Sequence, residues 1–424
     1  MRTIAIIGCG SSAMILGHAL LNHGGYDVTV FSEKTSAQWY DGPPTGTPFV
    51  AGENIDIERE LGIEHWEDQM FFGDGIMLDY RATRDADPLT VRGRFAKLGA
   101  AVDLRTRVRR WMDDFETRGG HLVIEQVSRD RIEAIGRSAD LTVLAAGKGE
   151  LASLVPRDNE RSEFDGPQRR LIASLVTGIK GWGLRNAHLT RPIKFTFFGD
   201  AGEWFFVPFT HRTTGPCYAL NFMVRPDSYL DVFNDTQTCD QFVKIAKSII
   251  AELAPEDIHS VSDCRPVNDQ FNYLPFFKGI TPQVRQSHRA LESGGILLPI
   301  GDASITYDPI GGQGYNSAAR HAKWVADAII ERRAAPFDSS WAAGVFDEFW
   351  EAHGRWACAW NNLMLKGLPP ATGMALSYGA ENSDFADAIF KDYFRPRAFF
   401  SWLTDIDEVQ KRISTHTQSR RSES

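Results

Sequence analysis

The chain has 424 residues, of which 43% are hydrophobic and 24% are charged, and its formal net charge is −9 at pH 7. This length and composition are typical of a globular protein with more than one packed unit, and they exclude a disordered or fibrous chain. The acidic balance and the lack of a basic cluster with interleaved aromatic residues argue against nucleic-acid binding.

Cysteine usage and hydropathy bear on the location of the protein. Five cysteines are scattered along the chain without a CxxC pair. This favours a reducing compartment such as the cytoplasm and gives no reason to expect a metal site. No apolar run approaches the roughly 18 residues that cross a bilayer. We therefore expect a cytoplasmic protein without membrane contact.

The N-terminal residues predict the start of a parallel sheet. Residues 3–8 form a short β-branched run, residues 11–24 carry apolar side chains at helical spacing, and residues 27–33 form a second strand. A strand, helix and strand within about 30 residues are typical of a βαβ unit. Residues 39–55 are rich in proline and glycine, so we expect an extended loop there.

The next segment continues this unit. A helix is expected over residues 102–120, and strands at 121–127 and 140–147 extend the same sheet. The helix contains the basic stretch RTRVRR, which we place on a solvated face.

The pattern changes near residue 165. A helix is expected at 239–254, residues 294–303 return to the strand type of the first unit, and residues 335–424 have a mostly helical pattern. Short aromatic β-rich segments between turns favour an antiparallel sheet with one face on a core. These segments are residues 171–179, 193–199, 203–209 and 217–224.

The first strand ends in the motif G-x-G-x-x-A at residues 8–13. Gly8 permits a tight turn, Gly10 lets a pyrophosphate approach the backbone, and Ala13 lets the helix lie close to the strand. Glu33 follows Ala13 by 20 residues, where a carboxylate can accept hydrogen bonds from an adenosine ribose. These features predict a dinucleotide site, and a tight turn without a ligand is the alternative.

A second glycine-rich stretch, GDASITYDPIGGQGYNSA at residues 301–318, suggests which dinucleotide binds. Asp302 at a strand end can bind a polyol hydroxyl, which FAD has in its ribitol and NAD lacks. The loop then opens a helix, whose amides and dipole can stabilise negative charge on the pyrimidine edge of a reduced flavin. A helix cap with a Pro-Gly turn is the alternative. We predict FAD contacts from Gly8, Gly10, Ser11, Ser12, Ala13, Glu33, Gly147, Gly301, Asp302, Pro309, Gly312, Gln313, Gly314 and Asn316.

These motifs resemble the FAD-dependent aromatic hydroxylase superfamily, and in particular the epoxidase component of two-component styrene and indole monooxygenases. The similarity includes residues 8–13, the strand end Ala146-Gly147 and the pattern GD…DPxxGQGxN. The phrases AVDLR, FDGPQR and RWACAWNN also resemble that family, over most of residues 1–365.

The resemblance implies an α/β fold, with a Rossmann-like FAD-binding domain of the aromatic hydroxylase (GR2) type. An antiparallel β-sheet substrate domain would be inserted into it, and a helical part would follow. On this basis we divide the chain into a first FAD-binding part, a β-rich substrate domain, a second FAD-binding part and a C-terminal helical region, at residues 1–160, 161–295, 296–334 and 335–424.

The resemblance also implies a reaction. A separate NADH-dependent flavin reductase would supply FADH2, which reacts with O2 to give a C4a-(hydro)peroxyflavin that epoxidises or hydroxylates an aromatic or alkene substrate such as styrene or indole. Arg105 would contact the flavin or its phosphates, with a surface salt bridge as the alternative. Homodimerisation is also implied. No catalytic residue is identified, and the flavin-side candidates are Pro48, Pro309 and Gly312.

The residue at position 48 departs from the family pattern, and the residues of the substrate pocket are not fixed by the resemblance. Pro48 falls where family members carry a flavin-side Asn, which leaves the substrate open. We expect an apolar aromatic pocket, and ordinary core packing is the alternative for each aromatic candidate. The candidates are Phe71, Phe72, Trp204, Phe206, Pro208 and Tyr307.

Three other functions remain open at this stage. A flavin halogenase of the same superfamily would need a positioned Lys and a W-x-W-x-I-P stretch, which GWGLRN at 181–186 does not match. A single-component hydroxylase would accept NAD(P)H itself. A non-oxygenating flavin-binding protein would use its Trp-rich C-terminal part to bind a partner.

Overall fold

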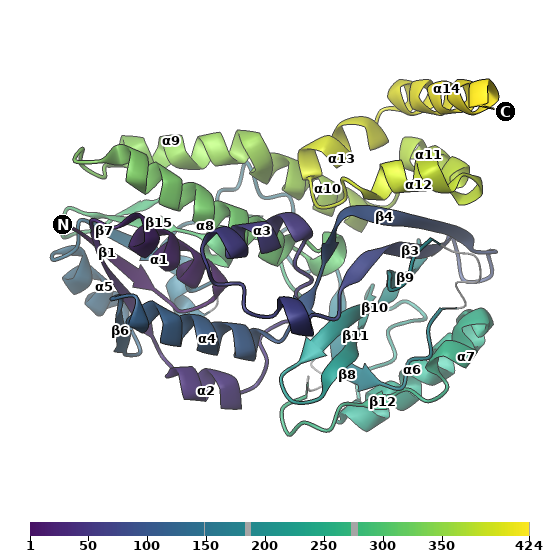
Figure 1. Ribbon diagram of the computed structural model, residues 1–424, viewed down its shortest axis with the longest axis horizontal. Coiled ribbons are helices and arrows are strands. Elements are labelled where there is room, and N and C mark those ends of the chain that lie inside the picture. The colour runs from purple at the N-terminus through teal and green to yellow at the C-terminus, as the bar shows by residue number, and fades with distance from the viewer. Residues whose placement is uncertain (148, 183–187, 273–278, 424) are drawn as a thin grey trace.

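The computed structural model describes residues 1–147, 149–182, 188–272 and 279–423. Two sheets lie side by side beneath a layer of helices that crosses both of them (Figure 1). The N-terminal sheet and the β-rich second sheet correspond to the two kinds of strand pattern that the sequence predicts.

The first sheet has the order β14-β15-β7-β1-β2-β6 within the described residues. Every neighbouring pair is parallel except β14 with β15. The carboxyl ends of β1, β2, β7 and β15 therefore meet at one edge, where ligands bind in open α/β sheets. The strands are β1 (Arg2–Ile7), β2 (Tyr26–Ser32), β6 (His121–Ile124), β7 (Leu141–Leu144), β14 (Arg289–Ala290) and β15 (Ile296–Pro299).

Alternate residues of β1 build two cores on opposite faces of this sheet. Ile4 and Ile6 pack with the buried faces of α1 (Ser11–His23), α4 (Leu104–Thr117) and α8 (Gln313–Arg332). Ala5 and Ile7 pack instead on α5 (Arg129–Gly136). The predicted βαβ unit is thus confirmed, and the return of the chain at β15 is confirmed with it.

The second sheet has eight strands among the described residues, in the order β12-β8-β11-β10-β9-β3-β4, with β5 paired to β10. It is antiparallel except for the pairs β3–β9 and β5–β10. The strands are β3 (Gly73–Arg81), β4 (Leu89–Gly99), β5 (Ala101–Val102), β8 (Arg170–Thr177), β9 (Ile193–Phe198), β10 (Gly202–His211), β11 (Gly215–Val224) and β12 (Arg265–Pro266).

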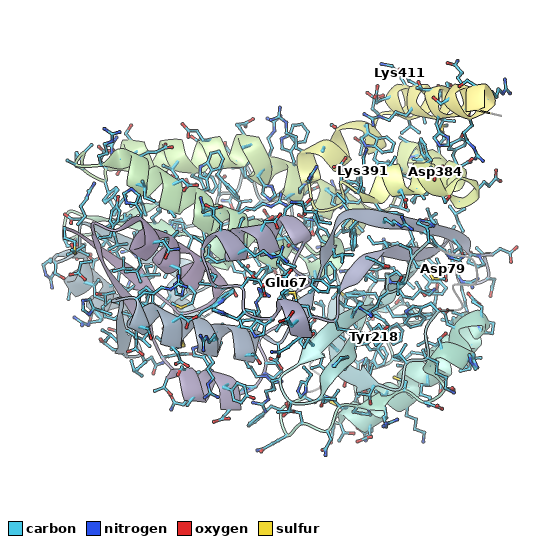
Figure 2. The ribbon with its side chains drawn as sticks, viewed as in Figure 1. Glu67, Asp79, Tyr218, Asp384, Lys391 and Lys411 are labelled. Atoms are coloured by element: carbon cyan, nitrogen blue, oxygen red, sulfur yellow. The ribbon has the colours of Figure 1, made fainter. Side chains whose placement is uncertain are left out.

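Each face of the second sheet is covered by helices. One face packs on α6 (Cys239–Leu253), and the other packs on the C-terminal helices. Figure 2 shows this arrangement, with Asp79 and Tyr218 on the sheet and Asp384 and Lys391 in the layer above it. The C-terminal elements are α9 (Ser339–Phe349), the π-helical turn η6 (Trp350–Gly354), α10 (Arg355–Lys366), α11 (Pro370–Glu381), α12 (Ser383–Phe390), α13 (Pro396–Leu403) and α14 (Ile406–Glu423).

No helix in the described part of the chain is both long and apolar enough to cross a membrane.

Short elements complete the chain. The remaining elements are α2 (Ser36–Asp41), α3 (Gly52–Glu60), η1 (Glu67–Gln69), η2 (Glu150–Leu154), η3 (Pro255–Asp257), α7 (Ile258–Val261), β13 (Gln283–Val284), η4 (Gly301–Ala303), β16 (Ile305–Thr306) and η5 (Pro309–Gly311).

Three local expectations need correction. The hairpin β3–β4 was not predicted, and it joins the second sheet although it lies within residues 1–160. The extended loop at 39–55 is shortened by α2 and α3 at its two ends. Within RTRVRR, Arg105 and Arg107 are 1% and 0% exposed, because each forms a buried ion pair with a carboxylate on another segment or at the helix start.

Candidate active site

The first glycine loop, residues 8–13, has one tightly packed and one open position. At Gly8 φ is 104°, and an added Cβ would lie 2.9 Å from the backbone nitrogen of Ala146. A Cβ added at Gly10 would meet nothing within 4 Å. Gly10 is the N-cap of α1 and provides no side-chain cap. The first amides of α1 are therefore suited to an anion, as the motif predicts.

The helix behind this loop and the acid beyond it lie where the motif requires. Ala13 is fully buried, and Ser11 and Ser12 are half-buried at the start of α1. Glu33 directly follows β2, the neighbour of β1. Its side chain is 61% exposed and lies 3.9 Å from Lys34. The carboxylate is thus accessible at the carboxyl edge of the sheet.

The second glycine loop, residues 301–318, touches the first one. A Cβ added at Gly301, where φ is 58°, would lie 2.4 Å from Ser12 Oγ. A Cβ added at Gly147 would lie 2.4 Å from Asp302 Cβ. Segments separated by about a third of the chain or more therefore meet at one edge of the sheet, and glycine is needed at both contacts.

The start of α8 repeats the arrangement at α1. Asp308 accepts a hydrogen bond from the Ile310 amide at 3.0 Å and fixes the turn η5. Gly312 follows with φ 62° and ψ 23°, a left-handed conformation that favours glycine, and it gives α8 no side-chain cap. A Cβ added at Gly314 would meet nothing within 4 Å. The N-terminus of α8 is therefore a second open helix end, beside Pro309.

Asn316 has a structural task that its place in the motif did not reveal. Its side chain is 1% exposed. It donates to the carbonyl oxygens of Phe49 at 2.9 Å and Gly312 at 2.8 Å, and it accepts from the Ala51 amide at 2.9 Å. The Asn316 side chain thus joins the second glycine loop to residues 49–51, which also brings Pro48 beside this loop.

A buried charge cluster holds the second glycine loop against the second sheet. Arg169 donates to Asp308 of the loop and to Glu203 of β10, and these side chains are 3%, 0% and 1% exposed. Burial raises the pKa of Glu203 to about 7, although Arg169 opposes this shift. The sequence analysis did not single out Arg169 or Glu203. The only available signal was the position of Arg169 at the end of FDGPQR.

Arg105 lies in a buried ion-pair network. It pairs with Asp103 at 2.6 Å and with Asp269 at 3.2 Å, and its Nη2 lies 3.2 Å from His211 Nε2. Because Arg105 is 1% exposed, neither the surface salt bridge nor a solvated face describes it. The network connects the start of α4 to β10 and to the segment that follows β12.

The candidates for the substrate pocket separate into three groups. Trp204 and Phe206 belong to the core beneath α6. Pro208, two residues further along β10, lies on the same face of the strand. Tyr307, within the second glycine loop, belongs to the same buried cluster as Phe349. Phe71 and Phe72 are half-buried just before β3.

The opposite face of β10 lies toward the second glycine loop. Phe205, Val207 and Phe209 share a core with Phe394, and a Cβ added at Gly312 would lie 3.5 Å from the Phe394 ring. The sequence could have indicated this division, because residues at alternate positions of the strand 203–209 lie on opposite faces of the sheet.

Three buried polar side chains converge on Gly311. A Cβ added there would lie 3.4 Å from Asn361 Oδ1, 3.4 Å from Gln313 Cγ and 3.6 Å from Trp360 Cδ1. In the part of the chain that the structure describes, Asn361 Oδ1 and Nδ2, Gln313 Oε1 and Trp360 Nε1 have no hydrogen-bond partner. Unpaired buried polar atoms cost about 1–3 kcal/mol each, so this point suits a polar group or a water that would pair them.

Comparison with known proteins decides the class. Residues 147–259 match a domain family described as "Styrene monooxygenase A putative substrate binding domain". The chain is 27% identical over 411 residues to the styrene monooxygenase StyA of Pseudomonas fluorescens, which covers 93% of this chain and 92% of the relative. Its identity to StyA of a Pseudomonas species is 26% over the same length and with the same coverage.

The chain is similar to styrene monooxygenases over 93% of its length, and these comparisons support an FAD-dependent monooxygenase. Solved structures with the same fold include the flavin-dependent brominase Bmp2, with a TM-score of 0.66, 13% identity and coverage of 98% of this chain and 99% of the other. They also include pqsL, "a probable FAD-dependent monooxygenase" from Pseudomonas aeruginosa, with a TM-score of 0.58, 16% identity and coverage of 91% and 98%. At these identities the similarity shows the fold alone.

A flavin halogenase was one alternative from the sequence, and the brominase likeness, at 13% identity, does not bear on it because it shows the fold alone. The sequence at 181–186 lacks the W-x-W-x-I-P pattern. Residues 183–187 lie outside the described residues, so the structure adds nothing on this point. The sequence relatives are named as monooxygenases.

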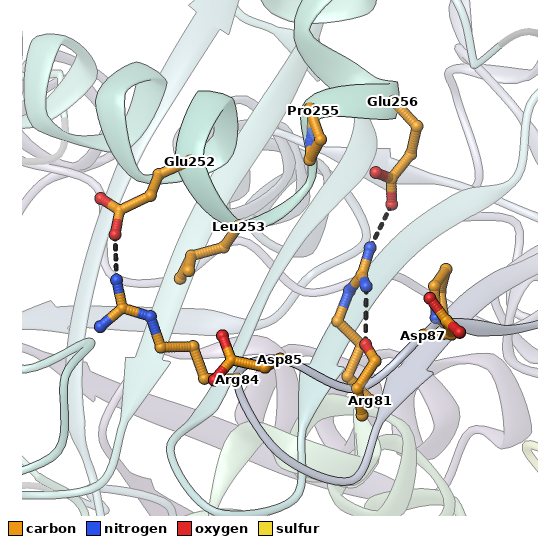
Figure 3. Close-up of a pocket in the computed structure, with 10 residues that line it drawn as sticks. Arg81, Arg84, Asp85, Asp87, Glu252, Leu253, Pro255 and Glu256 are labelled. Atoms are coloured by element: carbon orange, nitrogen blue, oxygen red, sulfur yellow. Dashed lines mark hydrogen bonds and ion pairs between the residues drawn. The ribbon is translucent and has the colours of Figure 1, made fainter.

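A separate cavity of about 420 Å³ lies at the far end of the substrate sheet, between the end of α6 and the turn after β3 (Figure 3). Arg81 pairs with Glu256 at 2.6 Å, and Arg84 pairs with Glu252. This cavity shares no residue with either glycine loop. We therefore assign it no part in the monooxygenase site.

Proposed function

We propose that this chain is the oxygenase of a two-component system. It accepts FADH2 from a separate NADH-dependent flavin reductase and uses O2 to epoxidise or hydroxylate an aromatic or alkene substrate similar to styrene or indole. The observation that carries the proposal is the junction of the two glycine loops at the carboxyl edge of the parallel sheet. Residues 147–259, which include β8 to β11 of the adjacent sheet, match a family described as "Styrene monooxygenase A putative substrate binding domain", and this match supports the choice of substrate.

The residues at this junction fit FAD. Gly10 and Gly314 leave open space where a side chain would stand, and both adjoining helices lack a side-chain cap. The helix α1 would bind the pyrophosphate, and α8 would face the pyrimidine edge of the flavin. Glu33 would accept a hydrogen bond from the adenosine ribose, and Asp302 would bind the ribitol.

Bound reduced FAD supplies two electrons, so that one oxygen atom of O2 enters the substrate and the other leaves as water. The protein then has to orient the substrate, stabilise charge and exclude water. The N-terminal amides of α8 stabilise negative charge at the pyrimidine edge. The side chains of Phe49, Phe205 and Phe394, each at most 8% exposed, form an apolar boundary that suits a planar hydrophobic substrate.

Oxygen transfer is the direct test of this proposal. Purified chain, chemically reduced FAD and O2 are mixed with styrene, indole or a thioether, and the products are identified by chromatography. We expect an epoxide from styrene and a blue pigment from indole. Flavin oxidation without product would support the non-oxygenating alternative. Heat-denatured chain is the control for spontaneous chemistry.

A second mixture tests the two-component arrangement. We expect FAD and NADPH with the chain alone to keep the flavin oxidised, because the proposal places nicotinamide chemistry in the reductase. Rapid bleaching of the flavin would instead indicate a single-component hydroxylase. A homodimer located in the cytoplasm remains part of the proposal.

A further inference from the structure

A groove of about 560 Å³ lies between α8, the π-helical turn η6 and the start of α13. This volume falls within the range of about 300–1,000 Å³ that is usual for small-molecule sites. It is a separate feature from the glycine loops, and no step of the proposed reaction uses it. The polar and aromatic residues that line it are Arg320, His353, Trp356, Arg395, Arg397 and Ser401.

Arg320 is the central feature of this groove. Its Nε donates to Asn54 Oδ1 at 3.1 Å. No described residue accepts a hydrogen bond from its terminal nitrogens or forms an ion pair with it. Burial lowers the pKa of Arg320 below its ordinary value. Glu53 attracts the Arg320 guanidinium only through space, because the two side chains form no ion pair. A guanidinium that has lost part of its hydration without gaining a bonded counterion is unfavourable, and an anion would compensate for that cost.

The other charges at the groove leave a positive excess. The positive charge of Arg395 is compensated by nearby carboxylates, because Arg395 pairs with Glu53 at 3.1 Å and with Asp392 at 3.4 Å. Arg397 is exposed and has no ion-pair partner among the described residues, and its guanidinium lies 5.9 Å from the centroid of the Trp356 ring. The excess is local, because the whole chain carries a net charge of −9.

His353 adds no positive charge near neutral pH. Burial and the neighbouring Arg320 lower its pKa to about 3. Its Nε2 lies 2.8 Å from Ser317 Oγ, so it can offer only a hydrogen bond to a ligand. The charge recognition therefore depends on the two arginines that lack carboxylate partners, Arg320 and Arg397.

We propose that this groove binds the oxyanion group of a small molecule, a carboxylate or a phosphate, between Arg320 and Arg397. The planar fork of a guanidinium matches the two oxygens of such a group. Trp356 forms the adjoining wall and suits a ligand whose anion is attached to a flat ring.

The side chains of Asn54 and Asn316 lie between the proposed anion site and the proposed flavin site. Asn54, which accepts from Arg320, donates to Asn316 Oδ1 at 2.8 Å on its other side. Asn316 in turn donates to the carbonyl oxygen of Gly312. FAD and the anion should therefore bind together.

Isothermal titration of the purified, flavin-free chain with inorganic phosphate, benzoate or acetate at constant ionic strength tests the proposal. We expect saturable binding, and Arg320→Gln should weaken it by about tenfold or more, as for the loss of a charge-assisted contact. Arg355→Gln is the matched control, because Arg355 contacts the Trp356 ring but does not line the groove. Tighter binding of benzoate than acetate would identify an aromatic carboxylate as the class, and preference for phosphate would identify a phosphate ester.

Three results would overturn the proposal. They are no binding of any of the three anions to the wild-type chain, equal binding by Arg320→Gln, or loss of binding when the chain is saturated with FAD. If Arg320→Gln does not fold, the exposed Arg397→Gln takes its place, and it must weaken binding while its circular dichroism spectrum stays that of the wild type.

Discussion

At the scale of single residues, Gly8 and Gly10 stand two positions apart but have different surroundings. A side chain at Gly8 would press on the end of β7, whereas one at Gly10 would enter open space. We therefore expect Gly10→Val to leave the free energy of unfolding within about 0.5 kcal/mol of the wild-type value. The same change should weaken FAD binding by about tenfold or more, because it fills the space assigned to the pyrophosphate.

Gly344 offers the matched control for this change. It is an exposed residue of α9, and a Cβ there also meets nothing within 4 Å. Gly344→Val should bind FAD as the wild type does, as measured by flavin fluorescence titration. Equal affinity in Gly10→Val and Gly344→Val would remove the first glycine loop from the flavin site.

Glu203 makes stability depend on pH. Burial raises its pKa in the folded chain to about 7, whereas an unfolded Glu has a pKa of about 4.3. The folded chain thus holds an extra proton between these values, so the free energy of unfolding falls as the pH rises through this window. The loss attributable to Glu203 is about 4 kcal/mol at most.

Denaturant unfolding at pH 5 and pH 8 measures this effect. Glu203→Gln should lose less stability than the wild type between these two pH values, because its side chain stays neutral. Glu252→Gln serves as the control, since the Glu252 side chain is 61% exposed. An identical pH dependence in the wild type and Glu203→Gln would show that Glu203 stays ionised beside Arg169.

At the scale of elements, one amide side chain joins three segments. Asn316 of α8 bonds to residues 49–51 and to Asn54 of α3. Asn316→Ala would leave several buried polar groups unpaired, and we expect a loss of about 2–4 kcal/mol in the free energy of unfolding. Asn362→Ala is the control, because among the described residues the Asn362 side chain bonds to Glu163 alone, which is exposed. Similar unfolding midpoints for the two variants would contradict this role.

The elements also show which parts of the fold the sequence can predict. The strands β1 and β2 were predictable because both are β-branched runs, and glycines at residues 8 and 24–25 mark the two ends of the segment between them. The hairpin β3–β4 was not, since LTVRGRFAKLG mixes charged residues with apolar ones and is partly exposed. Arg105 and Arg107 were misplaced because their partners lie on the helix cap or on other segments, which local periodicity does not reveal.

The candidate site shows the same limit. Gly8 and Gly312 have a local backbone reason, because each has a positive φ that favours glycine. Gly10 was predictable from its place in the G-x-G-x-x-A motif. The contact of Gly301 with Ser12 and the salt bridge from Arg169 to Asp308 join residues that are distant in sequence. Such pairs require the tertiary structure.

At the scale of the whole molecule, the site forms where the two sheets meet under the C-terminal helices (Figure 1). The parallel sheet and its connections supply the glycine loops, and the second sheet supplies the apolar face of β10 and the acid Glu203. The C-terminal helices add Asn361 and Phe394 beside the same loop. This explains why a flavin site can depend on residues from nearly the entire chain.

The most direct test of this account is an anaerobic titration of the wild-type chain with reduced FAD, followed by fluorescence or calorimetry. The account predicts saturable binding of one FAD per chain, competed by oxidised FAD and weakened by Gly10→Val. A folded chain that takes up neither redox form of FAD would contradict it.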